Sequence, residues 1–227
     1  MYKVTYLLRL GDPADEMTTD MTVKRITAAA EAAGIRQPLV ARTLPGVRNG
    51  GDLLAHFRFA SKSDWLSHRN TVDEAMAAPA IEHIDSVEYT GDGRSGRRRS
   101  PGPSTVYRTL LLRVHDSASP TEIARFEHAT LQMPQHIPAI RAWQLSRVDR
   151  AAGTAQWTHV WEQEFTDIDG LLGSYMNHPV HWALVDQWFD PECPQQIVKD
   201  RICHSFCAIP APVIDPAPES GSAAEEG

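Results

Sequence analysis

Two stretches of this chain begin alike, and this internal repeat limits the folds open to the chain more than any other feature. Residues 5–12 read TYLLRLGD and residues 109–116 read TLLLRVHD, which share Thr, two Leu, Arg and Asp at matching positions. Each stretch is short, rich in apolar residues and ends in turn residues, which is typical of a β-strand. A repeat of this kind predicts two halves with similar folds.

The segments after the two openings follow the same order in both halves. Ser119, Pro120 and Glu122 form a capping box with proline at the first helical position, so we expect a helix over 119–134. The first half offers a matching helix over 18–34, where the final glycine can end it. We then expect strands at 38–46, 52–61 and 83–91 with a helix at 63–79, and strands at 140–149, 156–165 and 201–210 with a helix at 167–189.

The order β-α-β-β-α-β, present twice, predicts the α+β class with two ferredoxin-like repeats. Each repeat would form an antiparallel four-stranded sheet with both helices on one face. We expect the N-terminal repeat at 1–90 and the C-terminal repeat at 105–209. The Arg-, Gly- and Pro-rich residues 91–104 are expected to form a flexible linker, and the Pro/Ala/Glu-rich residues 210–227 a disordered tail.

Composition and charge narrow the class of protein. The net charge of −7 disfavours broad nucleic-acid binding, although four arginines between residues 90 and 105 offer a local basic patch as an alternative. No apolar run approaches the roughly 20 residues of a membrane helix, and the first residues do not resemble a signal peptide. Three cysteines suit a reducing compartment. We therefore expect a cytoplasmic protein with a small-molecule partner, and neither nucleic acid nor membrane as a partner.

The second half resembles the dimeric α+β barrel proteins of the stress-responsive A/B barrel (Dabb) family, which includes a plant polyketide cyclase. Residues 137–149, 157–165 and 175–185 carry the resemblance, and the H-P-x-H element at residues 178–181 is its most specific part. In that family two sheets, normally from two chains, pack face to face. The resemblance implies that this chain builds an intramolecular barrel from its own two halves. A homodimer of the fused barrel is a further assembly to consider.

The resemblance also implies an acid–base site inside the C-terminal half. By position, the family's site residues fall on His159, Tyr175 and His181, while Arg108 and Thr130 replace a family histidine and tyrosine. We expect His181 to act as the base, with Tyr175 and His159 as donors. A neutral imidazole suits removal of a proton beside a carbonyl, and a phenol can donate a hydrogen bond to the resulting enolate.

The remaining expected site residues would bind the substrate. Arg108 would supply a fixed positive charge for a carboxylate or enolate, and Trp143 and Trp157 would form the walls of an apolar pocket. The predicted function is a cofactor-independent cyclase, isomerase or lyase acting on a small carbonyl compound, aromatic or polyketide-like. The full substrate-binding set is Arg108, Thr130, Trp143, Trp157 and His178.

Other interpretations stay open at this point. His178 could be a helix-start residue whose ring binds backbone, His159 a satisfied strand histidine, and Tyr175 a core aromatic. His178 and His181 could hold a metal with His159 or His204, although nothing resembles a known zinc motif. For the whole protein, the alternatives are a non-catalytic ligand-binding barrel and a haem-dependent dehydratase or oxygenase. The enzyme and the non-catalytic barrel differ in whether His159, Tyr175 and His181 converge on one cavity, and a haem protein would show a Soret band.

Overall fold

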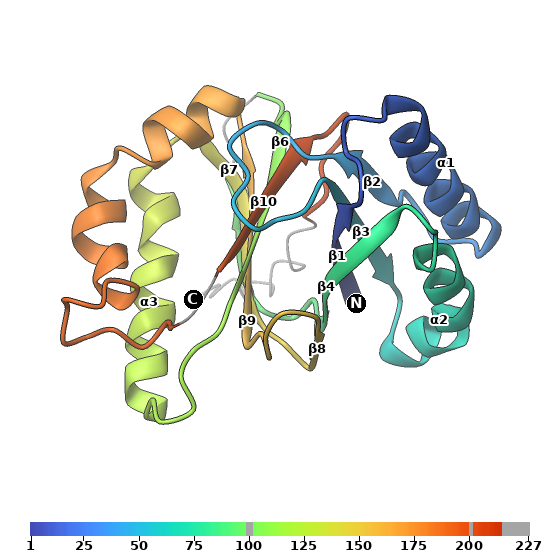
Figure 1. Ribbon diagram of the computed structural model, residues 1–227. Helices are drawn as coiled ribbons and strands as arrows, with labels where there is room; N and C mark the ends of the chain where they lie inside the picture. Colours follow the sequence, from blue (N-terminus) through green and yellow to red (C-terminus); the bar gives the residue numbers. More distant parts are fainter. Residues whose placement is uncertain (99–101, 200–201, 215–227) are drawn as a thin grey trace, which may run out of the picture.

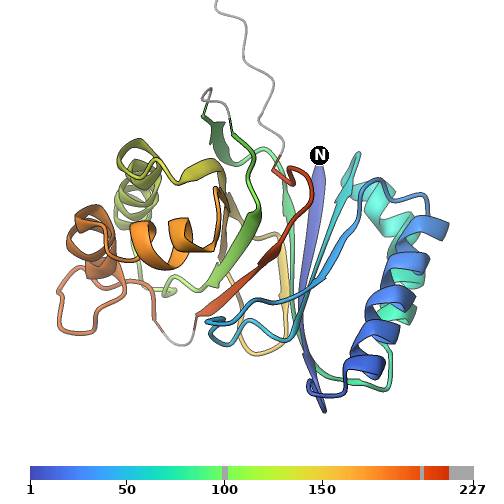
Figure 2. The same cartoon turned by 90° about the horizontal axis from the view of Figure 1, so that it is seen from above.

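The chain forms two antiparallel sheets that lie against each other in the middle of the molecule, with helices on both outer faces (Figure 1 and Figure 2). This computed structural model describes residues 1–98, 102–199 and 202–214. The expected α+β class with two ferredoxin-like repeats is confirmed. The strand order β2-β3-β1-β4 of the first half recurs as β7-β9-β6-β10 in the second.

The first sheet consists mainly of strands from the N-terminal half. Helices α1 and α2 cover its outer face (Figure 2). The side chains of Asp15 and Ser61 cap these helices by accepting hydrogen bonds from the amides of Thr18 and Asp64. The elements are β1 (Tyr2–Leu10), α1 (Glu16–Ala32), β2 (Leu39–Arg42), β3 (Leu53–Phe59), α2 (Lys62–Met76) and β4 (Ile81–Thr90).

The second sheet repeats this arrangement, with helix α3 on its outer face. The expected capping box is present, because Ser119 accepts from the amide of Glu122 and the Glu122 carboxylate accepts from the amide of Ser119. The elements are β6 (Val106–Leu112), α3 (Pro120–His136), β7 (Ile140–Arg147), β9 (His159–Phe165) and β10 (Cys203–Ala208).

The second helix of the C-terminal half differs from the expectation of one continuous helix over 167–189. The chain instead forms two segments of wide, π-type turns, η1 (Gly170–Tyr175) and η2 (Val180–Val185), followed by a short 3₁₀ segment, η3 (Asp186–Trp188). Pro179, which has no N–H to donate, precedes η2 and separates it from η1. In this arrangement the rings of Tyr175 and His181 lie edge-on to each other at a centroid distance of 4.8 Å.

Each sheet gains one short strand from outside its own repeat, β5 (Arg94–Arg97) from the segment between the halves and β8 (Arg150–Ala152) from the C-terminal half. Strand β5 pairs with β7, and β8 pairs with β4. The expectation of a flexible segment at 91–104 is therefore wrong for β5. Its arginines are engaged within the protein: Arg94 lies 2.6 Å from Glu127 and Arg97 lies 3.4 Å from Glu164. The last of the four clustered arginines, at position 99, falls outside the described residues.

An apolar interior with a buried polar centre lies between the two sheets. Its apolar members come from both halves and include Leu7, Leu54, Leu111, Cys203 and Cys207, so the two cysteines are small buried groups as expected. The polar centre is the Lys3 ammonium, which binds the Glu162 carboxylate at 3.0 Å and the Gln144 side chain at 2.7 Å. Polar contacts of this kind fix how the two sheets are placed.

The first residues of the expected disordered tail are ordered. The Glu164 carboxylate accepts hydrogen bonds from the amides of Val213 and Ile214 at 2.6 and 2.7 Å, and both side chains are buried. The expectation of disorder from residue 210 is thus wrong for 210–214, while 215–227 lies outside the described residues.

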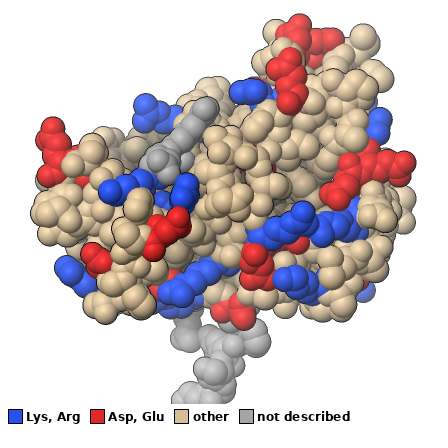
Figure 3. Space-filling model, turned by 60° about the horizontal axis from the view of Figure 1, so that its bottom comes forward, with Lys and Arg blue, Asp and Glu red and all other residues tan. Residues whose placement is uncertain are grey.

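Charged side chains of both signs are interspersed on the face of the molecule shown in Figure 3. In the described ranges 1–98, 102–199 and 202–214, no helix combines the length and the apolar character that crossing a bilayer requires.

Candidate functional site

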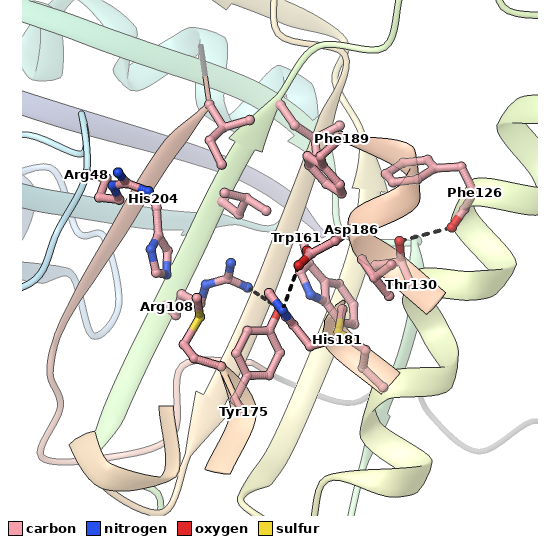
Figure 4. Close-up of a pocket in the computed structure, with 16 residues that line it drawn as sticks. Arg48, Arg108, Phe126, Thr130, Trp161, Tyr175, His181, Asp186, Phe189 and His204 are labelled. Carbon is pink, nitrogen blue, oxygen red and sulfur yellow. Dashed lines mark hydrogen bonds and ion pairs between the residues drawn. The ribbon is translucent and has the colours of Figure 1, made fainter. Parts of the chain in front are cut away.

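A cavity of about 260 Å³ lies between the second sheet and the helical segments that cover it (Figure 4). Strands β6, β9 and β10 supply one wall, and α3 with η1 to η3 supplies the other. Apolar side chains such as Phe126, Trp161 and Phe189 form most of the lining. The polar and charged lining residues are Arg48, Arg108, Thr130, Tyr175, His181, Asp186 and His204.

His181 forms a carboxylate–imidazole pair with Asp186 at this cavity. The His181 Nδ1 lies 3.5 Å from Asp186 Oδ2, and the imidazole is 14% exposed while the carboxylate is 46% exposed. Within the described part of the chain, Nε2 of His181 has no hydrogen-bond partner, so it is available to a ligand. A carboxylate beside Nδ1 orients the ring and stabilises the imidazolium that forms when Nε2 accepts a proton.

Arg108 and Tyr175 form a hydrogen-bonded pair next to this imidazole. Arg108 Nη1 donates to the Tyr175 hydroxyl at 3.2 Å and also to the side-chain oxygen of Gln163. Because Arg108 donates to the phenol oxygen, the proton of that hydroxyl stays available for donation to a ligand. The Tyr175 ring in turn lies edge-on to His181.

The guanidinium of Arg108 is buried without a compensating anion. It is 4% exposed, its Nε has no hydrogen-bond partner, and no described carboxylate lies within ion-pair distance of it. Burial lowers the pKa of Arg108, against the opposing effect of Tyr175. A buried positive charge of this kind favours a negative charge on whatever occupies the cavity.

Four of the eight expected site residues meet at this cavity: Arg108, Thr130, Tyr175 and His181. Thr130 contributes shape rather than a free hydroxyl, because its Oγ1 donates to the carbonyl of Phe126 at 3.0 Å.

His159, expected as a second catalytic histidine, lies outside the cavity. Its Nε2 is 3.2 Å from the Glu127 carboxylate, its Nδ1 is 2.8 Å from the Thr158 hydroxyl, and its ring packs edge-on against Phe126. Phe126 therefore stands between His159 and the cavity. The expectation that His159 and His181 converge on one point is wrong, and His159 is a satisfied strand histidine next to a different, shallower hollow of about 680 Å³.

His178 and the two expected tryptophans are also absent from the lining. The His178 Nδ1 accepts a hydrogen bond from the amide of Val180 at 3.2 Å, the helix-start role that was the alternative for it. Trp157 lies between the two sheets and donates to Asp85 at 3.3 Å, and Trp143 packs against β5 at Gly96. In the parts of the chain that the structure describes, no three His, Cys, Asp or Glu side chains group together as metal ligands.

His204 is a lining residue whose role sequence reasoning missed, since it was considered only as a third metal ligand. On β10 the small residues Cys203, Ser205 and Cys207 face the other sheet, so the alternation of strand faces directs His204 and Phe206 towards the helices. Burial, together with the electrostatic effect of Arg108, His181 and Arg48, lowers the pKa of His204 to about 2. The imidazole is therefore neutral.

Arg48 is the second missed residue, and it belongs to the other half of the chain. It lies in the loop between β2 and β3 of the N-terminal half, which runs alongside β10. No local signal in the sequence marks this arginine, because only the docking of the two halves brings it to the cavity.

Two sheets closed face to face within one chain define an intramolecular dimeric α+β barrel with a cavity on the helix-covered side of one sheet. Residues 106–203, within the C-terminal half of the chain, match the model of the stress-responsive A/B barrel domain family (Dabb). The expected family is confirmed for that half.

Solved structures share this architecture over nearly the whole chain. An anthrone oxidase-like protein is 13% identical with a TM-score of 0.65, and the match covers 91% of this chain and 90% of that one. A mutant chlorite dismutase from Candidatus Nitrospira defluvii is 9% identical with a TM-score of 0.54, covering 92% and 91%. At these identities the similarity concerns the fold alone. No curated protein sequence matches this chain.

Proposed function

We propose that the protein is a cofactor-independent acid–base enzyme that removes a proton beside the carbonyl of a small substrate. One observation carries this proposal: a carboxylate-paired imidazole and a buried guanidinium without an anion line the same cavity, on either side of a tyrosine. Cyclisation, isomerisation and elimination of carbonyl compounds all begin with this proton transfer.

His181 acts as the base in the proposed reaction. With Nδ1–H directed at Asp186, the lone pair of Nε2 accepts the proton of the substrate C–H bond, and the electrons of that bond move into the enolate. The same imidazolium returns the proton to carbon or to a leaving group later in the reaction. Asp186 stabilises the imidazolium during this interval.

Arg108 and Tyr175 stabilise the enolate oxygen. The free proton of the Tyr175 hydroxyl donates to it, and Arg108 balances its negative charge from a site that is shielded from water. Donors that are already fixed in place before the charge develops contribute strongly to catalysis in such surroundings.

The two alternative functions fit this site less well. Of the three residues whose convergence distinguishes an enzyme from a passive ligand-binding barrel, Tyr175 and His181 meet at the cavity and His159 does not. The proposal therefore rests on Arg108 as the second group beside Tyr175. A haem is not favoured in this cavity, because sites for drug-sized ligands usually span about 300–1,000 Å³. The cavity has only about 260 Å³.

Deuterium exchange tests the proposal. A panel of small enolisable carbonyl compounds is incubated with the protein in D₂O, and incorporation beside the carbonyl is followed by NMR. We expect the wild type to exchange at least one compound, and His181→Gln to slow this exchange by about 10²–10⁴-fold, the usual contribution of a general base. The exposed His128, which does not line the cavity, provides the matched control His128→Gln. Equal rates in wild type and His181→Gln, or no exchange of any compound, would overturn the proposal.

A further inference from the structure

We propose that the substrate is a small oxo acid, and that its carboxylate is bound at the edge of the cavity by Arg48 of the N-terminal half together with His204 of the C-terminal half. This inference rests on the proposed function, because it names the substrate class of the same cavity. In this proposal, residues of both halves of the chain form the binding site.

The backbone fixes Arg48 beside His204. The amide of Arg48 donates to the His204 carbonyl at 3.0 Å, and the amide of His204 donates to the Arg48 carbonyl at 2.8 Å. The side chain of Asn49 donates to the Ile202 carbonyl at 3.0 Å. Residue 48 thus lies against β10 as an additional strand residue would.

Glycine at position 50 permits this close approach. A Cβ atom there would lie 2.6 Å from the His204 carbonyl oxygen and 2.7 Å from the Ser205 Cα. Contacts this short with backbone atoms force the chain apart. Only glycine lets the loop of the N-terminal half dock on β10 at this distance. Because Arg48 lies two residues before Gly50 in this loop, the close docking places Arg48 at the cavity.

The charges at the cavity call for a negatively charged ligand. The buried Arg108 and the exposed Arg48 both line it, and neither forms an ion pair within the described ranges. The acidic lining residue, Asp186, is occupied by His181. The buried Nε2 of His204 has no hydrogen-bond partner. An enolate beside Arg108 would use one of the two positive charges, and Arg48 remains for a second anionic group.

The positions of these groups in the cavity indicate how such a ligand would lie. Figure 4 shows Arg48 and His204 together at one end, Phe126 and Phe189 towards the other, and Arg108 with His181 between them. A carboxylate at the first end therefore places a neighbouring carbonyl near the base and the apolar remainder among the aromatic rings. One guanidinium and one imidazole N–H match the two oxygens of a carboxylate, whereas a phosphate dianion offers more acceptors than these donors satisfy.

A comparison of a carboxylate with its neutral amide tests this inference without any turnover. Binding of 3-phenylpropanoate and 3-phenylpropanamide is measured by calorimetry for the wild type, Arg48→Gln, Arg48→Lys and a matched control. The control is Arg36→Gln, which makes the same charge change at an exposed arginine that has no hydrogen bond or ion pair in the described structure and does not line the cavity.

We expect the wild type to prefer the carboxylate, and Arg48→Gln to weaken carboxylate binding by about threefold to fivefold while amide binding is unchanged, the size typical of an exposed ionic contact. Arg48→Lys should keep most of the preference, and Arg36→Gln should behave as the wild type. Equal binding of the two probes by the wild type, or an unchanged preference in Arg48→Gln, would overturn the inference. Tighter binding of 2-phenylethyl phosphate than of the carboxylate would overturn the assignment to a carboxylate.

This test separates the inference from the proposed function. His181→Gln should bind 3-phenylpropanoate as the wild type does, since Arg48 and His204 are intact in it. A carboxylate preference without deuterium exchange would leave the binding site standing and remove the enzyme. Deuterium exchange that depends on His181, without a carboxylate preference, would support the enzyme and remove the carboxylate-binding site.

Discussion

The ammonium of Lys3 and the carboxylate of Glu162 lie 3.0 Å apart between the two sheets, and the side chains of both residues are almost fully buried. Lys3 is on the first strand of the N-terminal half and Glu162 is on a central strand of the C-terminal half. The Tyr107 hydroxyl also donates to Glu162, the Lys3 ammonium also donates to Gln144, and the His56 ring lies 3.8 Å from Glu162. This ion pair connects the two halves at the centre of the barrel, at a point where water cannot replace either partner.

Removing one member of this pair should be strongly destabilising. In Lys3→Met the Glu162 carboxylate stays buried without its cation, so we expect the free energy of unfolding to fall by about 3–5 kcal/mol. Urea unfolding followed by tryptophan fluorescence measures this change. The ion pair of Lys62 and Asp149 also joins the two halves, at 3.3 Å, but it is largely exposed. Lys62→Met should therefore cost at most about 1 kcal/mol. A similar small loss for both variants would contradict a central role for Lys3.

His204 should make the stability of the protein depend on pH. Burial, with the nearby charges of Arg108, His181 and Arg48, lowers its pKa in the folded protein to about 2, whereas an unfolded histidine titrates near 6.5. Between these values the unfolded chain binds a proton that the folded chain does not. His204 therefore lowers stability as the pH falls below about 6.5, by up to about 1.4 kcal/mol per pH unit.

The variant His204→Gln should flatten this dependence. Between pH 6 and pH 4 we expect the free energy of unfolding to decrease less in this variant than in the wild type. The difference in slope should be about 1.4 kcal/mol per pH unit, which corresponds to one proton. The buried His56, whose pKa is also lowered by burial and by Lys3 and Arg58, keeps its own contribution in both proteins. His128→Gln, at an exposed position, should keep the wild-type slope. Equal slopes for wild type and His204→Gln would show that His204 is not held neutral.

Gly50 should tolerate no side chain. In Gly50→Ala the new methyl group would meet the His204 carbonyl at 2.6 Å, so we expect a loss of about 1–3 kcal/mol in the free energy of unfolding, typical of overpacking. Gly173→Ala is the matched control, since a Cβ there has no heavy atom within 4 Å and should leave stability almost unchanged. Urea unfolding of both variants provides the comparison. A Gly50→Ala variant as stable as Gly173→Ala would mean that the loop does not dock closely on β10.

Much of the fold could be predicted because its signals are local. The capping box at Ser119 and Glu122 and the matching openings at residues 5–12 and 109–116 are visible in short windows, and they were enough to predict two β-α-β-β-α-β halves. Strands β5 and β8 carry no such signal. Their residues are arginine, serine, glycine and alanine, which have little preference for strands, and they pair only because the other half offers a free sheet edge.

The candidate site could be predicted in part for the same reason. Tyr175 precedes the H-P-x-H element and His181 ends it, and the two rings do meet. They are brought together by wide turns that Pro179 interrupts rather than by one helix. The prediction for His159 is wrong because Phe126 of α3 packs against its ring and lines the cavity in its place. This contact depends on tertiary packing, and the position of His159 on β9 gives no sign of it. Arg48 comes from the other half and could not be found within the C-terminal sequence alone.

The rate of deuterium exchange in two single variants tests the central claim most directly. The compound that the wild type exchanges best is compared, at a temperature where all three proteins are folded, in His181→Gln and His159→Gln. His181 lines the cavity and His159 binds Glu127 outside it. The account predicts a loss of about 10²–10⁴-fold in His181→Gln and a nearly unchanged rate in His159→Gln. A rate that survives in His181→Gln and is lost in His159→Gln would contradict it.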